Sequence, residues 1–284
     1  MRVLITGHKG QLGRALMARF PGAVGVDLPE VDITQPRALD AVMAEARPEL
    51  ILHCAAWTDV DGAARDPQAA YKANGLGTQN VALAAAHAGA ALAYISTNEV
   101  FDGTKSAPYS EFDALNPLNP YGQSKRAGEW FTQNLCARFY IIRIAWLTAP
   151  GGRNFVHRII QLADERGALK VVTDEVANPT FVNDLSDALV TLVNTGQYGV
   201  YHLTNAGHCS RYEYARNILE LSGRAHIPVE PITLADFQRP STPPKFAPLA
   251  NTAAAALGIT LRPWEEALQE FLLAHEKKAE GGRQ

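Results

Sequence analysis

The chain has 284 residues, 47% of them hydrophobic and 19% charged, which indicates a globular, soluble protein with a sizeable core. Its 26 basic and 29 acidic residues give a net charge of −3. Because the sequence has no block of basic residues, we expect neither nucleic acid nor a membrane surface as a partner.

Short apolar runs alternate with helix-like stretches over the first part of the chain. The runs that predict strands are residues 3–6, 23–27, 50–54, 92–95 and 139–144. The stretches that predict helices are residues 11–20, 36–46, 67–88 and 120–136. Apolar strands that alternate with helices are typical of a parallel sheet covered on both faces. We therefore expect residues 1–150 to form an α/β domain with a Rossmann-like, doubly wound parallel sheet.

The regular alternation breaks at residues 149–152, which read Ala-Pro-Gly-Gly. Beyond this point helices are expected over residues 154–166, 184–195, 210–222 and 263–275, and strands over residues 169–173 and 200–203. The proline-rich residues 238–245 predict an irregular loop, a type of element that often binds ligands. We expect residues 151–284 to form mainly a smaller α/β C-terminal lobe that binds the substrate, with residues from about 169 to 203 contributing to the larger sheet.

Three glycines, Gly7, Gly10 and Gly13, follow the first predicted strand and open the first predicted helix. Such a turn lets a pyrophosphate approach bare backbone amides and the N-terminus of a helix. The spacing is Gly-x-x-Gly-x-x-Gly, and a glycine trio alone is weak evidence. Its position at a strand-to-helix junction nevertheless favours a dinucleotide site over a purely structural turn.

Acidic and small residues follow the second and third predicted strands. They suit contacts with the parts of a dinucleotide other than its pyrophosphate. Asp27 ends the second predicted strand, about 20 residues beyond the loop, where a carboxylate commonly accepts from the adenosine ribose. This favours NAD, although Lys9, Arg14 or Arg19 could accommodate an additional phosphate, and Asp27 could also be a solvated strand end. A second contact is offered by Asp32 and Ile33, the carboxylate accepting from the adenine amine. Residues that permit a close backbone approach, or simply tight packing, are Ala55, Ala56 and Trp57.

Tyr121 and Lys125 are four residues apart on a predicted helix, so their side chains share one face. A nearby ammonium favours the phenolate and lowers the phenol pKa toward the range useful for proton transfer. Thr97 ends the fourth predicted strand, at the sheet edge where ligands of parallel sheets bind. Tyr-x-x-x-Lys alone is often just an amphipathic helix face. Together with Thr97 and the glycine loop it predicts an enzyme that uses a nicotinamide cofactor, with Lys125 also holding the nicotinamide ribose.

These motifs resemble those of the extended short-chain dehydrogenase/reductase family, in the same order along nearly the whole chain. The similar segments are residues 6–13, 55–61, 96–103, 117–125, 143–146, 154–156, 178–180 and 239–240. The resemblance implies a nucleotide-sugar reductase that uses NADPH or NADH, since family members commonly accept both. The implied reaction is reduction of the C4 ketone of dTDP-4-dehydro-β-L-rhamnose.

The resemblance also implies roles for individual residues. Thr97, Tyr121 and Lys125 would be catalytic. The residues implied to line the cofactor are Gly10, Gln11, Leu12, Asp32, Ile33, Ala55, Ala56 and Trp57. The residues expected to contact the sugar nucleotide are Thr97, Asn98, Trp146, Asn154 and Arg239, although Trp146 could be a core aromatic. Arg239 and Lys245 are candidates for its diphosphate, or else surface side chains.

The chain departs from the family pattern beside the predicted site. Asn98 and Glu99 stand where the family usually has Asp-Tyr, and the carboxylate of Glu99 changes the charge beside the sugar. Another nucleotide-sugar reductase or an epimerase therefore stays open. A non-catalytic, cofactor-binding regulatory subunit is a further alternative, but the presence of Thr97, Tyr121 and Lys125 argues against it. Residues 61–65, Asp-Gly-Ala-Ala-Arg, also depart from the family pattern.

No metal site or disulfide framework is expected. The three cysteines, Cys54, Cys136 and Cys209, are far apart, and the eight histidines form no metal-binding pair. Asp59 and Asp61 favour a solvated loop over a cation site. The chain begins with a predicted strand and shows neither a secretory pattern nor a spanning apolar stretch, so we expect a cytoplasmic protein. The sequence leaves open whether the protein forms a homodimer.

Overall fold

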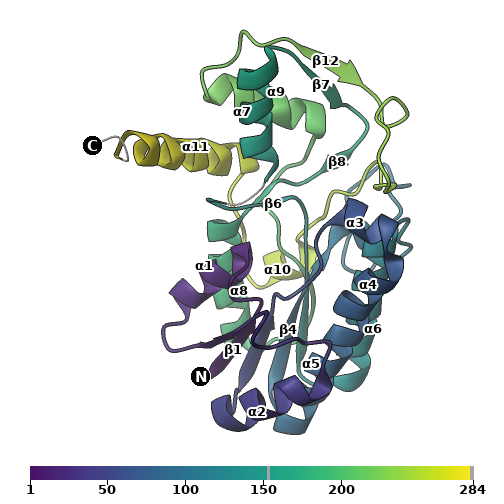
Figure 1. Ribbon diagram of the computed structural model, residues 1–284, viewed down its shortest axis with the longest axis vertical. Helices are drawn as coiled ribbons and strands as arrows, with labels where there is room; N and C mark the ends of the chain where they lie inside the picture. The colour runs from purple at the N-terminus through teal and green to yellow at the C-terminus, as the bar shows by residue number, and fades with distance from the viewer. Residues whose placement is uncertain (152–153, 282–284) are drawn as a thin grey trace.

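A six-stranded parallel sheet forms the lower part of the molecule (Figure 1). The computed structural model describes residues 1–151 and 154–281. The strands of the sheet are β1 (Val3–Thr6), β2 (Val24–Val26), β3 (Leu50–His53), β4 (Ala91–Thr97), β5 (Phe139–Ile144) and β10 (Gly199–His202). Their order, β10-β5-β4-β3-β1-β2, and their parallel pairing confirm the predicted Rossmann-like α/β class. The chain runs outward from β1 in both directions, and ligands of open parallel sheets bind beyond the strand ends at such a point.

Helices cover both faces of this sheet, which explains why its strands are continuously apolar. Alternate residues of a strand point to opposite faces. On β1, Val3 and Ile5 pack into the core formed with α1 (Gln11–Arg19) and α8 (Val182–Thr195). Leu4 packs on the other face, with α2 (Pro36–Ala46) and α5 (Gly77–Ala88). The helix α6 (Pro120–Leu135) packs beside α5 and against β4.

The helix expected over residues 67–88 is interrupted. It consists of α4 (Pro67–Tyr71), a π-helical turn η1 (Lys72–Leu76) and α5, and it is preceded by α3 (Val60–Arg65). A π turn adds a residue to the helical register, often at a functional site. Here it turns the buried side chain of Asn74 toward Trp57 and Ser124. Alanine-rich composition predicted the helix but could not reveal this local change of register.

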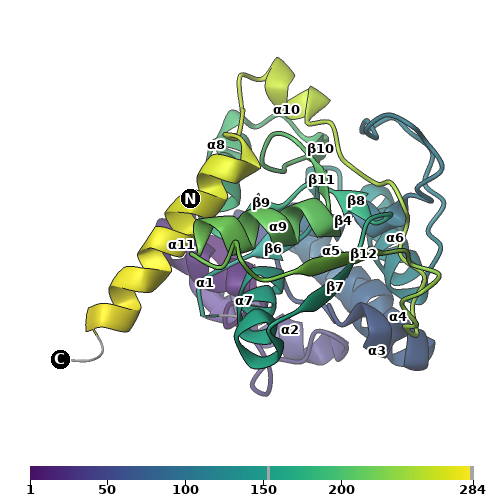
Figure 2. The same ribbon diagram turned by 90° about the horizontal axis from the view of Figure 1, so that it is seen from above.

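A second, smaller core builds the upper lobe. It is formed by α7 (Phe155–Arg166), α9 (Arg211–Leu221), α11 (Trp264–Gly281) and the parallel pair β7 (Leu169–Val172) and β12 (Val229–Ile232). In Figure 2 this lobe is seen in front of the sheet. The expected strand at residues 169–173 exists, but β7 pairs with β12 and not with the larger sheet. Only one face of β7 is covered, because Lys170 on the other face is exposed. By contrast, α8 and β10 belong to the large sheet and its core, as expected.

Short elements connect the two parts, and the sequence analysis did not predict them. They are η2 (Asn98–Val100), β6 (Leu147–Thr148), β8 (Val176–Ala177), β9 (Thr180–Phe181), β11 (Cys209–Ser210) and α10 (Thr252–Ala256). Two-residue strands lack a readable period, so only their partners define them. Residues 238–245 form neither helix nor strand, as expected.

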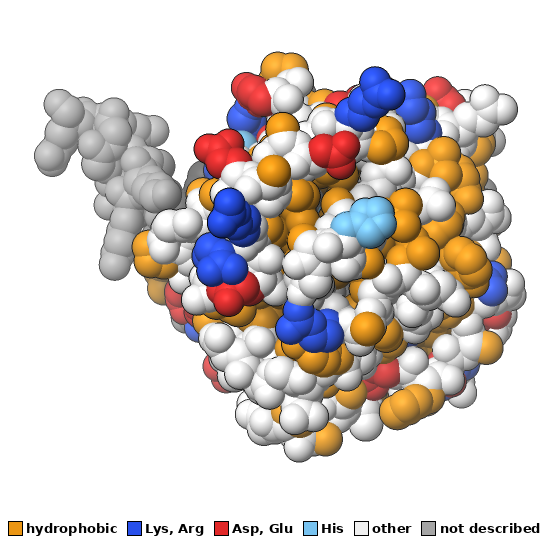
Figure 3. All heavy atoms as spheres, turned by 90° about the horizontal axis from the view of Figure 1, so that it is seen from below, with side chains coloured by type: hydrophobic (Ala, Val, Ile, Leu, Met, Phe, Trp, Pro, Cys, Tyr) orange, Lys and Arg blue, Asp and Glu red, His pale blue; other side chains and the backbone are white. Residues whose placement is uncertain are grey.

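The surface carries charges of both signs. Acidic and basic side chains are interspersed on the face shown in Figure 3, in keeping with the balanced composition of the chain. Within the described part of the chain, no helix has the length and apolar character that a membrane crossing requires.

Candidate active site

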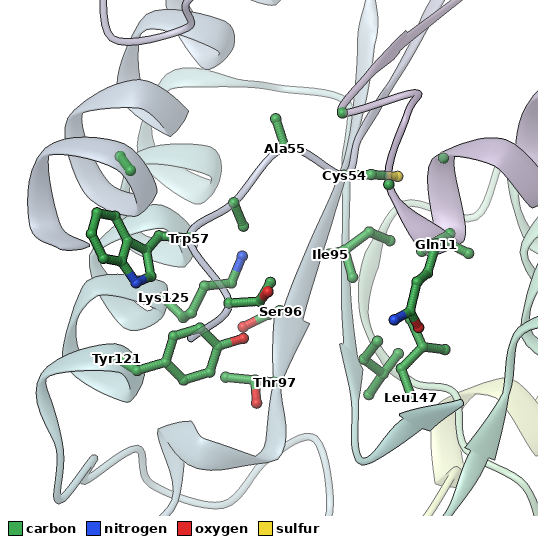
Figure 4. Close-up of a pocket in the computed structure, with 18 of the residues that line it drawn as sticks. Gln11, Cys54, Ala55, Trp57, Ile95, Ser96, Thr97, Tyr121, Lys125 and Leu147 are labelled. Atoms are coloured by element: carbon green, nitrogen blue, oxygen red, sulfur yellow. The ribbon is translucent and has the colours of Figure 1, made fainter. Parts of the chain in front are cut away.

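A pocket of about 730 Å³ lies beyond the carboxyl ends of the central strands (Figure 4). It runs from the glycine loop to the first turns of α6. The predicted residues that line it are Gly7, Gly10, Gln11, Leu12, Gly13, Asp27, Asp32, Ile33, Ala55, Ala56, Trp57, Thr97, Asn98, Tyr121, Lys125 and Trp146. The fold thus brings together every residue predicted for the cofactor and all three predicted for catalysis.

The glycine loop forms a cradle that side chains would fill. Gly7 has φ of +69°, and a Cβ there would lie 2.6 Å from the Ala55 amide nitrogen. A Cβ on Gly13 would overlap the carbonyl oxygen of Gly7. No side chain caps the N-terminus of α1, so its first amides are available to an anion. The loop therefore suits the pyrophosphate of a dinucleotide.

The three catalytic candidates lie on one wall of the pocket. Thr97 ends β4, and Tyr121 and Lys125 lie in the first two turns of α6, opposite Gln11 and Leu147 (Figure 4). The Thr97 side chain acts on the phenol of Tyr121, whose pKa it lowers. The Lys125 ammonium lies 4.2 Å from the centroid of the Tyr94 ring. A hydroxyl, a phenol and an amine therefore meet where a ligand would enter.

Burial governs the protonation of both titratable groups. It raises the pKa of Tyr121 well above the usual range, the Glu99 carboxylate raises it further, and the Thr97 side chain opposes this. Burial lowers the pKa of Lys125 to about 7, opposed by Glu129 and Cys54. The four-residue spacing predicts that the Lys125 ammonium lowers the Tyr121 pKa. In the structure the ammonium instead faces the Tyr94 ring, and desolvation dominates both groups.

A second pocket of about 1200 Å³ opens between α7, β7 and α9 and shares Trp146, Leu147 and Arg211 with the first. It is lined by both cations and aromatic rings. The cationic side chains are Arg158, Arg166, Lys170, Arg211 and Arg239, and the aromatic ones are Trp146, Phe155 and Phe237. Basic groups beside aromatic faces suit a phosphorylated ligand with a planar ring.

Comparison with known proteins finds the same architecture. The family model described as RmlD substrate binding domain matches residues 1–276. The chain belongs to the RmlD substrate binding domain family. This confirms the resemblance to nucleotide-sugar reductases that the motifs predicted.

Relatives of this family cover nearly the whole chain. The dTDP-4-dehydrorhamnose reductase of Mycobacterium tuberculosis is 36% identical over 284 residues, covering 96% of this chain and 93% of the relative. A probable dTDP-4,6-dihydroxy-2-methyloxan-3-one 4-ketoreductase of Streptomyces antibioticus is 35% identical, covering 95% and 94%. The crystal structure of Bacillus anthracis dTDP-4-dehydrorhamnose reductase in complex with NADP is 37% identical, with a TM-score of 0.92 and coverage of 96% and 99%.

Asn154 and Arg239, which the sequence predicts to bind the substrate, line the second pocket and not the first. Asn154 caps α7, because its Oδ1 accepts from the His157 amide at 2.9 Å. Arg239 lies 3.0 Å from Asp61 and 3.7 Å from Glu175. Arg239 is therefore paired with protein carboxylates.

Asp59 lies in an exposed loop, as expected, whereas Asp61 lies in α3 and is half-buried. Asp59 caps α3, and Asp61 binds both Arg239 and the hydroxyl of Ser241. Both acidic side chains thus serve structural contacts, and Asp61 docks the proline-rich loop onto the sheet domain. Asp61 and Arg239 are far apart in the sequence, so no local pattern predicts that they pair.

Arg211 and Glu175 belong to the site but were missed by the sequence analysis. The Arg211 guanidinium stacks 3.6 Å from the centroid of the Trp146 ring and lies 2.9 Å from Glu175. Trp146 has φ of +43°, a left-handed conformation that is uncommon for a bulky residue and often marks a binding site. No spacing in the sequence relates position 146 to position 211, so only folding could reveal the stack.

Asn74 was also missed, and it fixes the loop after β3. Its Oδ1 accepts from the Trp57 amide at 2.7 Å, and its Nδ2 donates to the Trp57 carbonyl at 3.0 Å and to Ser124 Oγ at 2.9 Å. Ser124 Oγ donates in turn to the Tyr121 carbonyl at 2.7 Å. The π turn thereby links the loop after β3 to α6.

Replacing Asn74 by Ala is expected to lower the free energy of unfolding by about 1 kcal/mol, because it leaves two part-buried backbone groups of Trp57 without their partner. The loop should also loosen, which raises the Kd for the cofactor. Urea unfolding and cofactor titration measure both effects. Asn134→Ala, at an exposed helix position, is the control and should change stability by less than about 0.5 kcal/mol. Equal behaviour of the two variants would contradict the assignment.

Proposed function

We propose that the protein reduces the C4 ketone of dTDP-4-dehydro-β-L-rhamnose to dTDP-L-rhamnose with NADPH or NADH. The convergence of Thr97, Tyr121 and Lys125 on a pocket that begins at the glycine loop carries this proposal. The names of the relatives support the choice of substrate. The function is thus that of a dTDP-4-dehydrorhamnose reductase.

Thr97 and Tyr121 act on the ketone oxygen. The Thr97 hydroxyl accepts from the Glu99 amide at 3.2 Å, and its own proton has a long contact of 3.4 Å with Asn98 Oδ1. That proton can turn to the substrate carbonyl and orient it. The phenol of Tyr121, which burial keeps protonated, gives its proton to the alkoxide that forms at C4.

Lys125 holds the nicotinamide ribose by charge-assisted hydrogen bonds. The cradle formed by Gly7 and Gly13, with the uncapped start of α1, fits the pyrophosphate of the cofactor. The bound cofactor supplies the hydride. The chain itself supplies the proton, the orientation and the exclusion of water.

The nucleotide of the substrate would occupy the second pocket. Its cations suit the diphosphate, and Trp146 and Phe155 offer flat faces at its entrance. Arg211 is the cation proposed for the diphosphate, because it lines both pockets whereas Arg239 lines only the second. In this proposal the sheet domain holds the cofactor and the lobe from residue 151 onward mainly holds the nucleotide sugar.

Asp27 is proposed to set the balance between NADH and NADPH. Its Oδ2 accepts from the Lys9 amide at 2.9 Å, and Lys9 itself pairs with Glu30 at 2.7 Å. Asp27→Asn keeps an acceptor for that amide but removes a charge beside the adenosine ribose. A unit charge about 4 Å away is worth about 1 kcal/mol in water, or roughly fivefold. We expect the ratio of kcat/KM for NADPH to that for NADH to rise by about this factor.

Steady-state kinetics with both cofactors measure this ratio. Asp32→Asn is the control, because Asp32 is proposed to face the adenine, which both cofactors share. An unchanged ratio in Asp27→Asn would remove Asp27 from the discrimination.

The function is tested by incubating the protein with NADH or NADPH and dTDP-4-dehydrorhamnose. Loss of absorbance at the reduced nicotinamide band and identification of dTDP-L-rhamnose by mass spectrometry and NMR are the expected results. Binding of NADPH without reduction of any 4-keto nucleotide sugar would instead indicate the regulatory subunit.

The carboxyl group of Glu99 in the pocket leaves open a second candidate, another 4-ketoreductase or an epimerase. An epimerase converts its substrate without net consumption of reduced cofactor. The same absorbance assay with several 4-keto nucleotide sugars therefore separates the two enzymes.

A further inference from the structure

Glu99 lies where β4 meets the start of α6. It follows Thr97 by two residues in η2 and lines the same pocket as Thr97 and Tyr121. Its Oε2 accepts a hydrogen bond from Asn119 Nδ2 at 2.6 Å. Asn119 caps α6, because its Oδ1 accepts from the Gly122 amide at 2.9 Å. The Glu99 carboxylate is therefore fixed against the first turn of the helix that carries Tyr121.

The backbone of Glu99 adds to this fixation. A Cβ at position 122 would overlap the Glu99 carbonyl oxygen, so α6 can approach η2 only with glycine there. The Asn119 amide also donates to the Thr242 carbonyl at 3.0 Å, which ties the proline-rich loop to the same point. Glu99 is thus held in a fixed place beside the start of α6, the helix that carries Tyr121.

Titratable groups from several elements face Glu99. They are Tyr121 at the start of α6, Glu175 between β7 and β8, Arg211 of α9 and Arg239 of the proline-rich loop. Burial raises the pKa of Glu99 to about 7, Asn119 opposes this, Glu175 adds to it, and both arginines oppose it. The Glu99 charge is, after burial itself, the next cause of the raised pKa of Tyr121.

We propose that Glu99 is a positioning residue whose negative charge adds to burial in holding the Tyr121 phenol in its protonated form and so sets the site for proton donation. This inference rests on the proposed role of Tyr121 as the acid in ketone reduction. Reduction adds a hydride to carbon and the Tyr121 proton to oxygen, whereas oxidation of the alcohol needs tyrosinate as the base. A carboxylate beside the phenol disfavours tyrosinate and therefore favours the form of the enzyme that reduces.

The proposal can be tested without any substrate. Biosynthetic replacement of tyrosine by a trifluorotyrosine, whose phenol ionises at lower pH, lets 19F NMR follow ionisation in folded protein. The 19F resonance that is missing from the spectrum of Tyr121→Phe is assigned to Tyr121. Glu99→Gln keeps an acceptor for Asn119, so the helix contact remains while the charge is lost. We expect the Tyr121 transition to move down by about one pH unit in Glu99→Gln.

Glu175→Gln is the matched control. It removes a carboxylate from the same cluster, but Glu175 is not among the groups that act on Tyr121. Its Tyr121 transition should stay at the wild-type pH. A Glu99→Gln transition that coincides with the wild type, or an equal shift in both variants, would overturn the proposal.

If the protein fails to reduce dTDP-4-dehydrorhamnose, the proposed function falls, and the 19F titration still decides the role of Glu99.

Discussion

Replacing Tyr121 by Phe is expected to lower kcat for ketone reduction by about 10²–10⁴-fold, because the only group removed is the acid that protonates the alkoxide. The phenylalanine ring fills the same volume, so the Kd for NADPH should stay close to that of the wild type. Stopped-flow or steady-state assays measure kcat, and fluorescence titration of the cofactor measures Kd. This is the most direct test of the mechanism.

A matched variant separates chemistry from packing. Tyr201 is a buried tyrosine whose hydroxyl donates to the Gln197 carbonyl at 2.7 Å, away from both pockets. Tyr201→Phe should lose about 1 kcal/mol of stability and keep its kcat. A Tyr121→Phe enzyme that turns over like Tyr201→Phe would remove Tyr121 from the mechanism.

Replacing Lys125 by Met is expected to weaken cofactor binding and, at the same time, to stabilise the protein. Loss of charge-assisted hydrogen bonds of about 1.5–3 kcal/mol corresponds to roughly 10–100-fold in the Kd of the cofactor. The Lys125 side chain is only 3% exposed, and replacing buried charges by apolar groups of similar size often adds about 1–4 kcal/mol of stability. Denaturant unfolding of the free protein, together with cofactor titration, measures both effects.

The gain in stability should depend on pH. The folded-state pKa of Lys125, about 7, lies below the ordinary value of lysine, so the unfolded chain binds more protons between these two values. The cost of burying Lys125 is therefore greatest at and below pH 7 and shrinks as pH rises toward about 10. The stability difference between Lys125→Met and the wild type should shrink in the same way.

An exposed lysine provides the comparison. Lys170 pairs with Glu230 at 2.9 Å on the surface, with 67% of its side chain exposed. Lys170→Met should change stability by less than about 0.5 kcal/mol. A Lys125→Met protein that is less stable than the wild type at pH 7 would contradict this prediction. It would show that the buried ammonium stabilises the folded protein.

The site shows which kind of residue could be predicted from sequence. The glycine loop, Asp27, Thr97, Tyr121 and Lys125 each sit at the end of a strand or the start of a helix, and all line the predicted pocket. Parallel strands bring their carboxyl ends to one edge, so local patterns suffice to place such residues together. Their individual roles remain proposals that the variants above test.

Other contacts could not be predicted because they join distant segments. Arg239 was interpreted as a diphosphate partner, yet it pairs with Asp61, and Arg211 stacks on Trp146. A charge in a loop has the same local pattern whether it binds a ligand or a carboxylate far along the chain. The protonation of Lys125 likewise depends on burial, which no spacing records.

The sequence by itself determined the parallel sheet, the glycine cradle and the identity of the three groups that meet above it, because period and position along strands and helices are local properties. Only the tertiary structure decided that β7 joins β12, that Asn74 sits in a π turn and that Glu99 is held against the start of α6. These features depend on which surfaces pack together and how much water they exclude. These packing energies arise from contacts between segments, so the sequence of a single segment does not predict them.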